Sequence, residues 1–349
     1  MKKSNILVTG AGGFIGGAFI EKLIQSWDEF EGYAGIRRWA SAARIGRFKT
    51  NFVLCDIMDT DSIEKALDDM SVIIHCAVGP PDVTVEGTRN LLEAAKKKNI
   101  DHFIYISSVD VYGENEGELS EELKLTKSGN AYGDSKIDAE AVCNSYIEQG
   151  LAVTIVRPAI VYGPFSKLWT VRFAERLQSG AWGFFDQADG YCNLTYIDDL
   201  VESVLSLVNK KEAFGNAYNI ISDDSITWNQ YFDELNNALD LPKLQKINSV
   251  KSNFKTKLFQ PVRSVAKFAL NKFPDLVQTF YTKYEWSKKI MQKTKTDLNL
   301  VPTSNELKLY NRKAIYKNEN IKKVTSINFT SMKEGVETSV KWLKHHRIV

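Results

Sequence analysis

Short apolar segments alternate with amphipathic segments through the first 160 residues, and this alternation limits the chain to few folds. The apolar segments have the length of strands and lie near residues 5–9, 33–37, 52–55, 72–76, 103–107 and 153–157. Segments with helical spacing of apolar residues lie between them, near residues 14–26, 60–69, 84–98 and 131–149. Almost continuously apolar strands that alternate with helices are typical of a parallel sheet covered on both faces. The sequence therefore predicts an α/β fold with a doubly wound parallel sheet and ligands at the carboxyl ends of its strands.

The alternation of strand-like and helical segments is less regular after Pro158, and this predicts a second, smaller lobe. A helix near 168–179, a strand near 217–221 and a helix near 227–239 are indicated there. A chain of 349 residues also exceeds the length at which single cores usually stop growing. We expect a Rossmann-type cofactor domain in residues 1–165, to which segments near 192–222 return. Residues 166–349 would then form mainly a substrate-binding lobe at the C-terminal side.

The formal net charge is only +2, but the charge is distributed unevenly along the chain. Residues 1–240 carry 22 basic and 36 acidic side chains, a net charge of −14, whereas residues 241–349 carry 23 and 7, a net charge of +16. The composition, with 44% apolar and 25% charged residues, excludes a disordered, collagenous or disulfide-scaffold chain. A basic last third predicts an anionic partner.

The cysteines and the apolar runs indicate a cytoplasmic protein without a metal site. The four cysteines (Cys55, Cys76, Cys143 and Cys192) lie far apart, and neither a Cys-x-x-Cys pair nor histidines at metal spacing accompany them. No apolar run approaches the 18 residues of a membrane span. Glycines interrupt the apolar stretch at the N-terminus, which is too short for a signal peptide.

A glycine-rich turn directly follows the first predicted strand. Thr9 is followed by Gly10-Ala11-Gly12-Gly13-Phe14-Ile15-Gly16, and a helix is predicted to begin there. Gly10 permits a tight turn, Gly13 allows the backbone to approach a pyrophosphate, and Gly16 allows close packing of helix on strand. The N–H groups at the start of the helix favour phosphate groups. This turn therefore predicts dinucleotide binding by a Rossmann-type fold.

The end of the second strand bears on the choice between NAD and NADP. An acidic residue usually stands there when NAD is bound, but this chain has Arg37 and Arg38. Arginine pairs well with a phosphate on the 2′ position of the ribose, so we expect NADP in preference to NAD. Solvated surface arginines are the alternative interpretation. Asp56, after the third strand, either accepts a hydrogen bond from the adenine or caps the helix near Thr60.

A tyrosine and a lysine four residues apart indicate carbonyl or alcohol chemistry. Tyr132 and Lys136 lie one turn apart on a predicted helix. An ammonium beside a phenol lowers the phenol pKa, which would make Tyr132 an acid or base. Ser108, at the end of the fifth strand, would bind the substrate oxygen at the same edge of the sheet. A nicotinamide beside these residues would allow hydride transfer.

Together, these segments resemble the extended short-chain dehydrogenase/reductase superfamily, also called the NAD-dependent epimerase/dehydratase family. The matching motifs lie between about residues 5 and 200: the glycine turn, Asp56-Ile57, His75-Cys76-Ala77, Gly87-Thr88-Arg89-Asn90-Leu91-Leu92, Ser107-Ser108-Val109-Asp110-Val111-Tyr112-Gly113, Tyr132 with Lys136, Arg157-Pro158 with Tyr162-Gly163-Pro164, and Tyr196-Ile197-Asp198-Asp199.

The resemblance implies a catalytic set of Ser108, Tyr132 and Lys136, with Lys136 also binding the nicotinamide ribose. It implies a homodimer formed through the helices near 84–98 and 131–149. The positions that it implies for the cofactor, together with the two arginines, are Gly10, Gly13, Phe14, Ile15, Gly16, Arg37, Arg38, Asp56, Ile57, Ala77, Lys136 and Pro158.

Three positions depart from the family pattern. Thr84 stands where an asparagine often supports the catalytic lysine, and its hydroxyl could keep that role with a water. Ile160 replaces an asparagine that lies next to the diphosphate in many sugar-nucleotide members. Val109 and Asp110 follow Ser108 where dehydratases have two acids, which favours reduction or epimerisation over dehydration.

The expected function is therefore NAD(P)-dependent reduction or epimerisation of a nucleotide-activated sugar or a related carbonyl or hydroxyl substrate. The alternatives are a hydroxysteroid- or dihydroflavonol-type dehydrogenase with an apolar substrate and a non-catalytic protein that senses dinucleotides. The basic last third contains a predicted amphipathic helix over Pro261–Phe273, which either packs on the core or meets an anionic partner. That partner would be a nucleotide diphosphate, a CoA-like phosphate or, by peripheral contact, a membrane surface that presents a lipid-linked substrate, and we do not expect nucleic acid.

Overall fold

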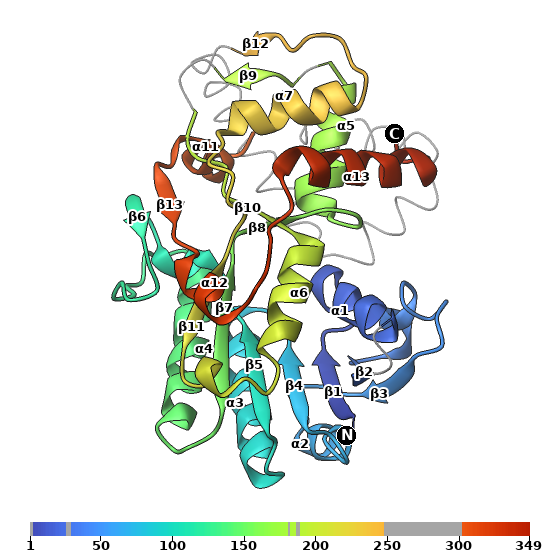
Figure 1. Ribbon diagram of the computed structural model, residues 1–349, viewed down its shortest axis with the longest axis vertical. Coiled ribbons are helices and arrows are strands. Elements are labelled where there is room, and N and C mark those ends of the chain that lie inside the picture. The colour runs from blue at the N-terminus through green and yellow to red at the C-terminus, as the bar shows by residue number, and fades with distance from the viewer. Residues whose placement is uncertain (1–2, 26–28, 181, 186–188, 248–301) are drawn as a thin grey trace, which may run out of the picture. The chain divides into compact units, whose positions relative to one another are not determined.

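The computed structural model describes residues 3–25, 29–180, 182–185, 189–247 and 302–349 (Figure 1). The chain divides into two compact units. The first consists of Met1–Ser166, Asn193–Asp224 and Ala314–Gly335, and the second of Lys167–Cys192, Ser225–Lys313 and Val336–Val349. Both units are therefore assembled from separate stretches of chain.

A seven-stranded parallel sheet forms the centre of the first unit, which confirms the predicted fold class. Its spatial order is β11-β7-β5-β4-β1-β2-β3. The strands are β1 (Ser4–Thr9), β2 (Phe30–Ile36), β3 (Asn51–Leu54), β4 (Val72–His75), β5 (His102–Ile106), β7 (Val153–Pro158) and β11 (Ala217–Ile220). The direction of winding reverses between β1 and β4, so the carboxyl ends of these two strands flank the point where such sheets bind ligands.

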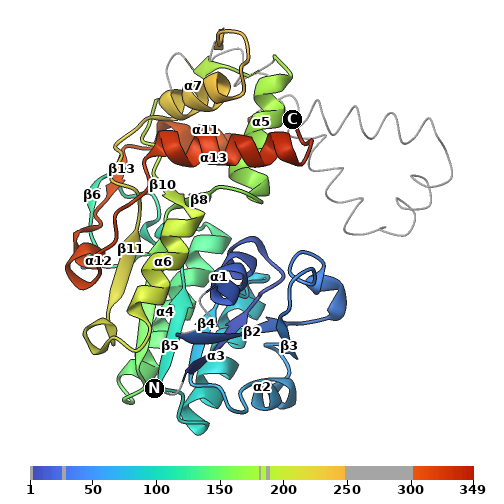
Figure 2. The ribbon, with the colours of Figure 1, turned by 45° about the vertical axis from the view of Figure 1, so that its right-hand side comes forward.

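Helices cover both faces of this sheet, as Figure 2 shows. Helices α2 (Thr60–Ala66), α3 (Pro81–Lys97) and α4 (Ala131–Ile147) supply one apolar layer, and α1 (Phe14–Gln25) lies beside α6 (Ile197–Leu207) on the other face. Because side chains alternate along a strand, Leu7 of β1 faces the layer of α2, α3 and α4.

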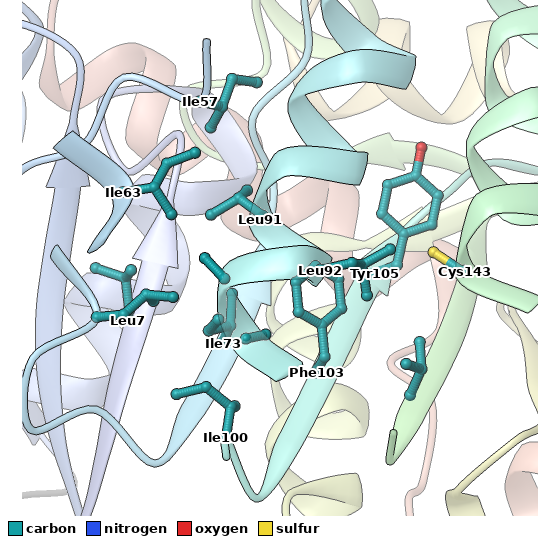
Figure 3. Close-up of a cluster of buried hydrophobic side chains, with 14 of the residues drawn as sticks. Leu7, Ile57, Ile63, Ile73, Leu91, Leu92, Ile100, Phe103, Tyr105 and Cys143 are labelled. Atoms are coloured by element: carbon teal, nitrogen blue, oxygen red, sulfur yellow. The ribbon is translucent and has the colours of Figure 1, made fainter. Parts of the chain in front are cut away.

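The core under α3 and α4 is built from side chains that are almost completely buried (Figure 3). Leu7, Ile73 and Phe103 of three neighbouring strands pack with Leu91 of α3, and Cys143 of α4 closes the layer beside Tyr105. Burying a side chain of this size contributes about 1.5–3 kcal/mol. This packing holds the strand ends, and with them the residues of the candidate site, in one arrangement.

Local signals explain where the helices begin. Asp59 accepts hydrogen bonds from the N–H groups of Asp61 and Ser62 at the start of α2, and Asn130 accepts one from Tyr132 at the start of α4. Pro81 occupies the first turn of α3, so this helix begins three residues before the predicted position at 84. Asp59 rather than Asp56 caps α2, which removes the helix-cap interpretation of Asp56.

Smaller elements complete the first unit. They are η1 (Trp39–Ala42), η2 (Val109–Tyr112), β6 (Gly117–Leu119), β8 (Ile160–Tyr162), β10 (Leu194–Tyr196), η4 (Lys211–Ala213), β13 (Ala314–Tyr316) and α12 (Glu319–Val324). Strand β6 pairs in parallel with β13, and β8 pairs in parallel with β10. Two late segments of the chain therefore return to the first unit.

The second unit has an aromatic core. Its elements are η3 (Lys167–Val171, a π-helical turn), α5 (Arg172–Gln178), β9 (Phe184–Phe185), α7 (Trp228–Ala238), β12 (Lys246–Ile247), α11 (Ser304–Asn311) and most of α13 (Met332–His345). Five aromatic rings form this core, and each lies within 4.7 to 6.3 Å, centroid to centroid, of at least one other: Phe173, Trp182, Trp228, Phe232 and Tyr310. Arg176 is buried among them and pairs with Glu306 at 2.9 Å.

The predicted amphipathic helix over Pro261–Phe273 lies outside the described residues. Within the described part of the chain, no helix has the length and apolar character needed to cross a membrane. The same residues contain no group of three or more His, Cys, Asp or Glu side chains able to hold a metal ion.

Candidate active site

The glycine turn lies at the carboxyl end of β1 and requires glycine for reasons of space. Gly10 has a φ of 68°, and a Cβ there would lie 2.8 Å from the backbone of Ala77, which follows β4. A Cβ at Gly16 would lie 2.4 Å from the carbonyl oxygen of Gly10. The turn is closed by a 2.9 Å bond from the Gly13 N–H to the Gly10 carbonyl, and Phe14 and Ile15 then open α1. The first N–H groups of α1 have no partner within the helix, so this end can receive phosphate groups.

Two exposed arginines follow β2 next to the same turn. Arg37 and Arg38 precede η1, whose Ser41 carbonyl lies so close to Gly12 that a Cβ there would be 2.2 Å away. Among the residues that the structure describes, neither Arg37 nor Arg38 forms an ion pair. Their guanidinium groups are therefore exposed beside the glycine turn.

The segment after β3 is held against α3. A Cβ at Gly87 of α3 would lie 2.3 Å from the side chain of Ile57, and Asn90 Nδ2 donates to the Ile57 carbonyl at 3.0 Å. Asp56 Oδ1 accepts a hydrogen bond from the Met58 N–H at 3.0 Å. Because one carboxylate accepts several hydrogen bonds, Asp56 retains capacity for another donor.

A buried histidine connects the strand ends on either side of the winding reversal. His75 Nδ1 lies 2.7 Å from Thr9 Oγ1, and His75 Nε2 lies 3.1 Å from Thr88 Oγ1. The Thr88 hydroxyl donates to the Thr84 carbonyl, so it accepts from His75, which places the imidazole proton on Nε2. Burial, and secondly Lys136, lower the pKa of His75 to about 3. The imidazole is therefore neutral and accepts from the Thr9 hydroxyl, which itself accepts from the Ala77 N–H at 3.3 Å.

Thr84 does not point its hydroxyl toward the lysine. Its Oγ1 donates to the Gly79 carbonyl at 3.1 Å and accepts from the Gly79 N–H at 3.2 Å. The Thr84 hydroxyl therefore closes the turn before α3, and its support of Lys136 through a water stays a prediction.

Ser108 and Tyr132 meet where η2 and the first turn of α4 come together. The Ser108 hydroxyl caps η2 by accepting from the Asp110 N–H at 3.1 Å, and it lies near enough to the Tyr132 phenol to act on its pKa. The close approach of α4 to η2 requires glycine at Gly133, because a Cβ there would lie 2.6 Å from the Asp110 carbonyl oxygen. Val109 is buried in the core beneath, so a second acid has no place beside Asp110.

Lys136 lies one turn further along α4 and is buried. Its Nζ donates to the Ile106 carbonyl at 2.8 Å and lies 4.7 Å from the centroid of the Tyr105 ring and 6.0 Å from that of Tyr132. Desolvation lowers the pKa of Lys136 to about 8, while nearby groups, among them Glu140, act in the opposite direction.

The pKa of Tyr132 changes in the direction opposite to the expected one. Desolvation, and then the Asp110 carboxylate, raise the pKa of Tyr132 to about 12, and only the hydrogen bond with Ser108 lowers it. The prediction of a lysine-lowered phenol pKa is wrong here. The reason is geometric, since the ammonium of Lys136 is directed to Ile106 and the Tyr105 ring.

Two charged residues at this edge were not predicted as site residues. Glu140 of α4 and Arg157 of β7 form a buried pair with Nη2 and Oε2 2.7 Å apart, and Pro158 follows Arg157 at the end of β7. The signals in the sequence were the position of Glu140 one turn after Lys136 and the presence of Arg157 in the Arg157-Pro158 motif.

A doubly wound parallel sheet, a glycine turn after its first strand and a Tyr-x-x-x-Lys helix at the same edge define the class of extended short-chain dehydrogenases/reductases. The chain matches the NAD dependent epimerase/dehydratase family over residues 6–220 and belongs to that family.

Named relatives agree with this assignment. The N-acetyl-alpha-D-glucosaminyl-diphospho-ditrans,octacis-undecaprenol 4-epimerase of Escherichia coli O157:H7 is 25% identical, over 68% of this chain and 72% of the relative. The UDP-glucose 4-epimerase of Vibrio cholerae is 28% identical, over 70% of this chain and 78% of the relative. Among solved structures, UDP-glucuronic acid 4-epimerase from Bacillus cereus in complex with NAD superposes with a TM-score of 0.71. It is 20% identical, over 98% of this chain and 99% of that one, so the likeness concerns the fold.

Proposed function

We propose that the chain is an NAD(P)-dependent oxidoreductase that reduces or epimerises a nucleotide-activated sugar. The observation that carries the proposal is the position of Ser108, Tyr132 and Lys136 at the carboxyl edge of the sheet that also bears the glycine turn. The named relatives are sugar epimerases, which supports this substrate class over the apolar substrates of a hydroxysteroid- or dihydroflavonol-type dehydrogenase.

The residues at this edge fit a dinucleotide. A side chain at Gly10 or Gly16 would fill the space in which the turn and the first helix meet, so backbone N–H groups remain exposed to a pyrophosphate. Phe14 and Ile15 would add the first N–H groups of α1, Asp56 and Ile57 would hold the adenine, and Ala77, Pro158 and Lys136 would hold the nicotinamide riboside.

The protonation states of the site support reduction. When bound, the nicotinamide would supply a hydride to the carbonyl carbon of the substrate. A phenol whose pKa is raised to about 12 is protonated at neutral pH, so Tyr132 can donate its proton to the substrate oxygen. Ser108 would orient that oxygen, and Lys136 would hold the nicotinamide ribose.

The finer cofactor proposal is a preference for NADP over NAD. Four arginines lie between the end of β2 and β3, and Glu21 pairs with two of them, Arg44 at 2.8 Å and Arg47 at 3.5 Å. Arg37 and Arg38 pair with no acid among the described residues, and guanidinium groups bind phosphate oxygens with two parallel hydrogen bonds. These two arginines would therefore hold a 2′-phosphate.

Incubation of the protein with NADPH or NADH and a panel of nucleotide sugars, keto-sugars and lipophilic ketones tests the function. We expect oxidation of NADPH or interconversion of epimers with a sugar-linked substrate only. Tyr132→Phe is expected to lower kcat by roughly 10²- to 10⁴-fold and to leave dinucleotide affinity unchanged. Full activity of this variant would contradict the mechanism. Tight cofactor binding without any turnover would instead support the dinucleotide sensor.

A lipid-linked sugar diphosphate is a second candidate substrate. It is supported by the relative named for an undecaprenol-linked sugar and by the net charge of +16 over residues 241–349. Positive charge of this size favours contact with an anionic membrane surface. Comparing a soluble nucleotide sugar with the same sugar on a polyprenyl diphosphate, at equal concentration in detergent, distinguishes the two substrates.

The assembly proposal is a homodimer formed through α3 and α4. These helices pack against each other, and α3 carries exposed pairs of opposite charge, Glu86 with Arg89 and Glu93 with Lys97. A contact through such a charged surface would weaken with added salt. Light scattering after gel filtration at low and high salt measures this, and a monomer at both would refute it. The cytoplasmic location expected from the free cysteines stays a prediction.

A further inference from the structure

The end of β5 is tied to α4 through two consecutive residues. The carbonyl of Ile106 accepts from Lys136 Nζ at 2.8 Å, and the next residue, Ser107, donates from Oγ to Glu140 Oε1 at 2.5 Å. Lys136 and Glu140 are one helical turn apart, so they project from the same face of α4. Both bonds are buried. Together they set the register of the helix on the strand.

The two reacting hydroxyls lie next to this joint, one residue further along the strand side and one helical turn earlier on α4. Ser108 follows Ser107 on the strand side, and Tyr132 lies one turn before Lys136 on the helix. Ser108 and Tyr132 interact with each other. The position of the strand end relative to the helix, which the bonds of Ile106 and Ser107 help to set, therefore contributes to the distance between the two hydroxyls.

The carboxylate that holds Ser107 is itself fixed by Arg157. Arg157 Nε lies 3.0 Å from Glu140 Oε1 and Nη2 lies 2.7 Å from Oε2, and the two side chains are only 6% and 2% exposed. The remaining Nη1 donates to the Tyr112 hydroxyl at 2.9 Å, which donates to Asn219 Oδ1 at 2.8 Å. A buried pair with both members satisfied in this way holds one geometry.

We propose that Glu140 is a positioning residue of the candidate site, which sets Ser108 against Tyr132 through Ser107 and supports the ammonium of Lys136. This role rests on the proposed function, because it acts through the residues assigned there. Its charge favours the protonated form of Lys136, whose pKa desolvation lowers to about 8.

A pair of matched variants tests the geometric part. Ser107→Ala removes the hydroxyl that joins β5 to Glu140, and Tyr112→Phe removes another hydroxyl of the same buried network without touching that joint. We expect both to lower Tm by similar amounts. Only Ser107→Ala is expected to lower kcat, by about tenfold, with KM and dinucleotide Kd within about twofold of the original chain. Equal kcat values for the two variants would overturn the positioning role.

Glu140→Gln tests the electrostatic part and needs no substrate. The amide keeps an oxygen for Ser107 but lacks the charge. We expect dinucleotide affinity to fall as Lys136 loses its proton, and the midpoint of that fall to lie about one pH unit or more lower in Glu140→Gln. Ser107→Ala retains the carboxylate and is expected to keep the original midpoint. If the pH midpoint of dinucleotide affinity did not move in Glu140→Gln, the proposal that Glu140 supports the Lys136 ammonium would be refuted.

These measurements separate failure of this role from failure of the proposed function. If the original chain turns over its substrate but the variants show neither effect, the positioning role alone is wrong. If no substrate of the panel reacts but the midpoint shifts, the substrate assignment is wrong and the role of Glu140 stands. If Glu140→Gln does not fold, the comparison of Ser107→Ala with Tyr112→Phe decides.

Discussion

A buried ammonium without a carboxylate in direct contact makes Lys136 costly for the fold. The lysine is 3% exposed, and among the described residues its Nζ donates a hydrogen bond to the Ile106 carbonyl alone. Its pKa in the folded chain is lowered to about 8. Below that pH the lysine is protonated, and the ammonium is more stable in the unfolded chain, where water solvates it. The stability penalty is complete below pH 8 and shrinks as the pH rises toward the unfolded pKa.

We therefore predict that Lys136→Met makes the protein more stable and inactive. At neutral pH the free energy of unfolding is expected to rise by about 1 kcal/mol or more, and the gain is expected to shrink above about pH 8. Thermal unfolding at neutral and alkaline pH measures this, with Lys96→Met, at an exposed lysine, as the control. A less stable Lys136→Met variant at neutral pH would show that the ammonium is stabilising.

The arginines after β2 make a second prediction at the scale of single residues. Arg37→Asp places an acid where NAD-binding sheets usually have one and removes a partner for a 2′-phosphate. We expect the ratio of NADPH to NADH affinity to fall by roughly 100-fold, since a charge-assisted pair contributes about 1.5–3 kcal/mol. Arg47→Ala is the control, because Arg47 lies in the same segment but pairs with Glu21. An unchanged ratio in Arg37→Asp would contradict the 2′-phosphate site.

At the scale of elements, the junction of the glycine turn with α1 depends on contact between backbones. A Cβ at Gly16 would lie 2.4 Å from the Gly10 carbonyl oxygen, which cannot move without opening the turn. At Gly17, one residue later, the nearest atom is the end of the Arg44 side chain at 3.1 Å, which can shift.

Gly16→Ala is therefore predicted to lower dinucleotide affinity by about tenfold or more and to reduce Tm. Gly17→Ala is expected to keep the affinity within about twofold, because the Arg44 side chain can make room for the methyl group. Alanine also favours a helix by about 1 kcal/mol over glycine, so the helix itself is not weakened. Titration of dinucleotide by protein fluorescence and thermal unfolding measure both variants. Equal affinities would show that the turn tolerates a side chain at Gly16.

Element boundaries show where local signals succeed and where they are overridden. Strands β1, β3, β4, β5 and β7 lie within one or two residues of the predicted segments, because apolar runs of strand length end where polar or glycine residues begin. Strand β2 begins at Phe30, earlier than the predicted residue 33, since pairing with Ser4 extends it. The predicted helix near 168–179 divides into a π-helical turn and α5.

At the scale of the whole molecule, late segments of the chain are anchored by the buried Asp199 and the half-buried Asp224. Asp199 accepts from the Thr330 N–H at 2.9 Å and from its hydroxyl at 2.7 Å, and Asp224 accepts from the Met332 N–H at 2.5 Å. The two carboxylates thus hold the start of α13 in the first unit. Their negative charge is also favourable beside the N-terminus of a helix. Desolvation, the largest effect, raises the pKa of Asp199 to about 6.

The raised pKa predicts how the stability changes with pH. The folded chain holds the Asp199 proton more tightly than the unfolded chain, so this group increases stability as the pH falls from above 6 toward 4. In Asp199→Asn, which resembles the protonated form, this contribution is absent. We expect the variant to gain stability over the original chain at neutral pH and to lose that advantage near about pH 4. Parallel Tm profiles over this range would contradict the assignment.

The doubly wound sheet, the glycine turn and the Tyr132–Lys136 spacing on one helix face could all be predicted from the order of the residues. Periodicity, turn residues and helical spacing are properties of neighbouring residues, so they can be recognised before the chain folds. Only the tertiary structure decided that Glu140 pairs with Arg157, that His75 is neutral and that the Tyr132 phenol pKa is raised. These properties depend on burial and on charges from distant strands, because desolvation and Coulomb energies follow distance in space rather than position along the chain.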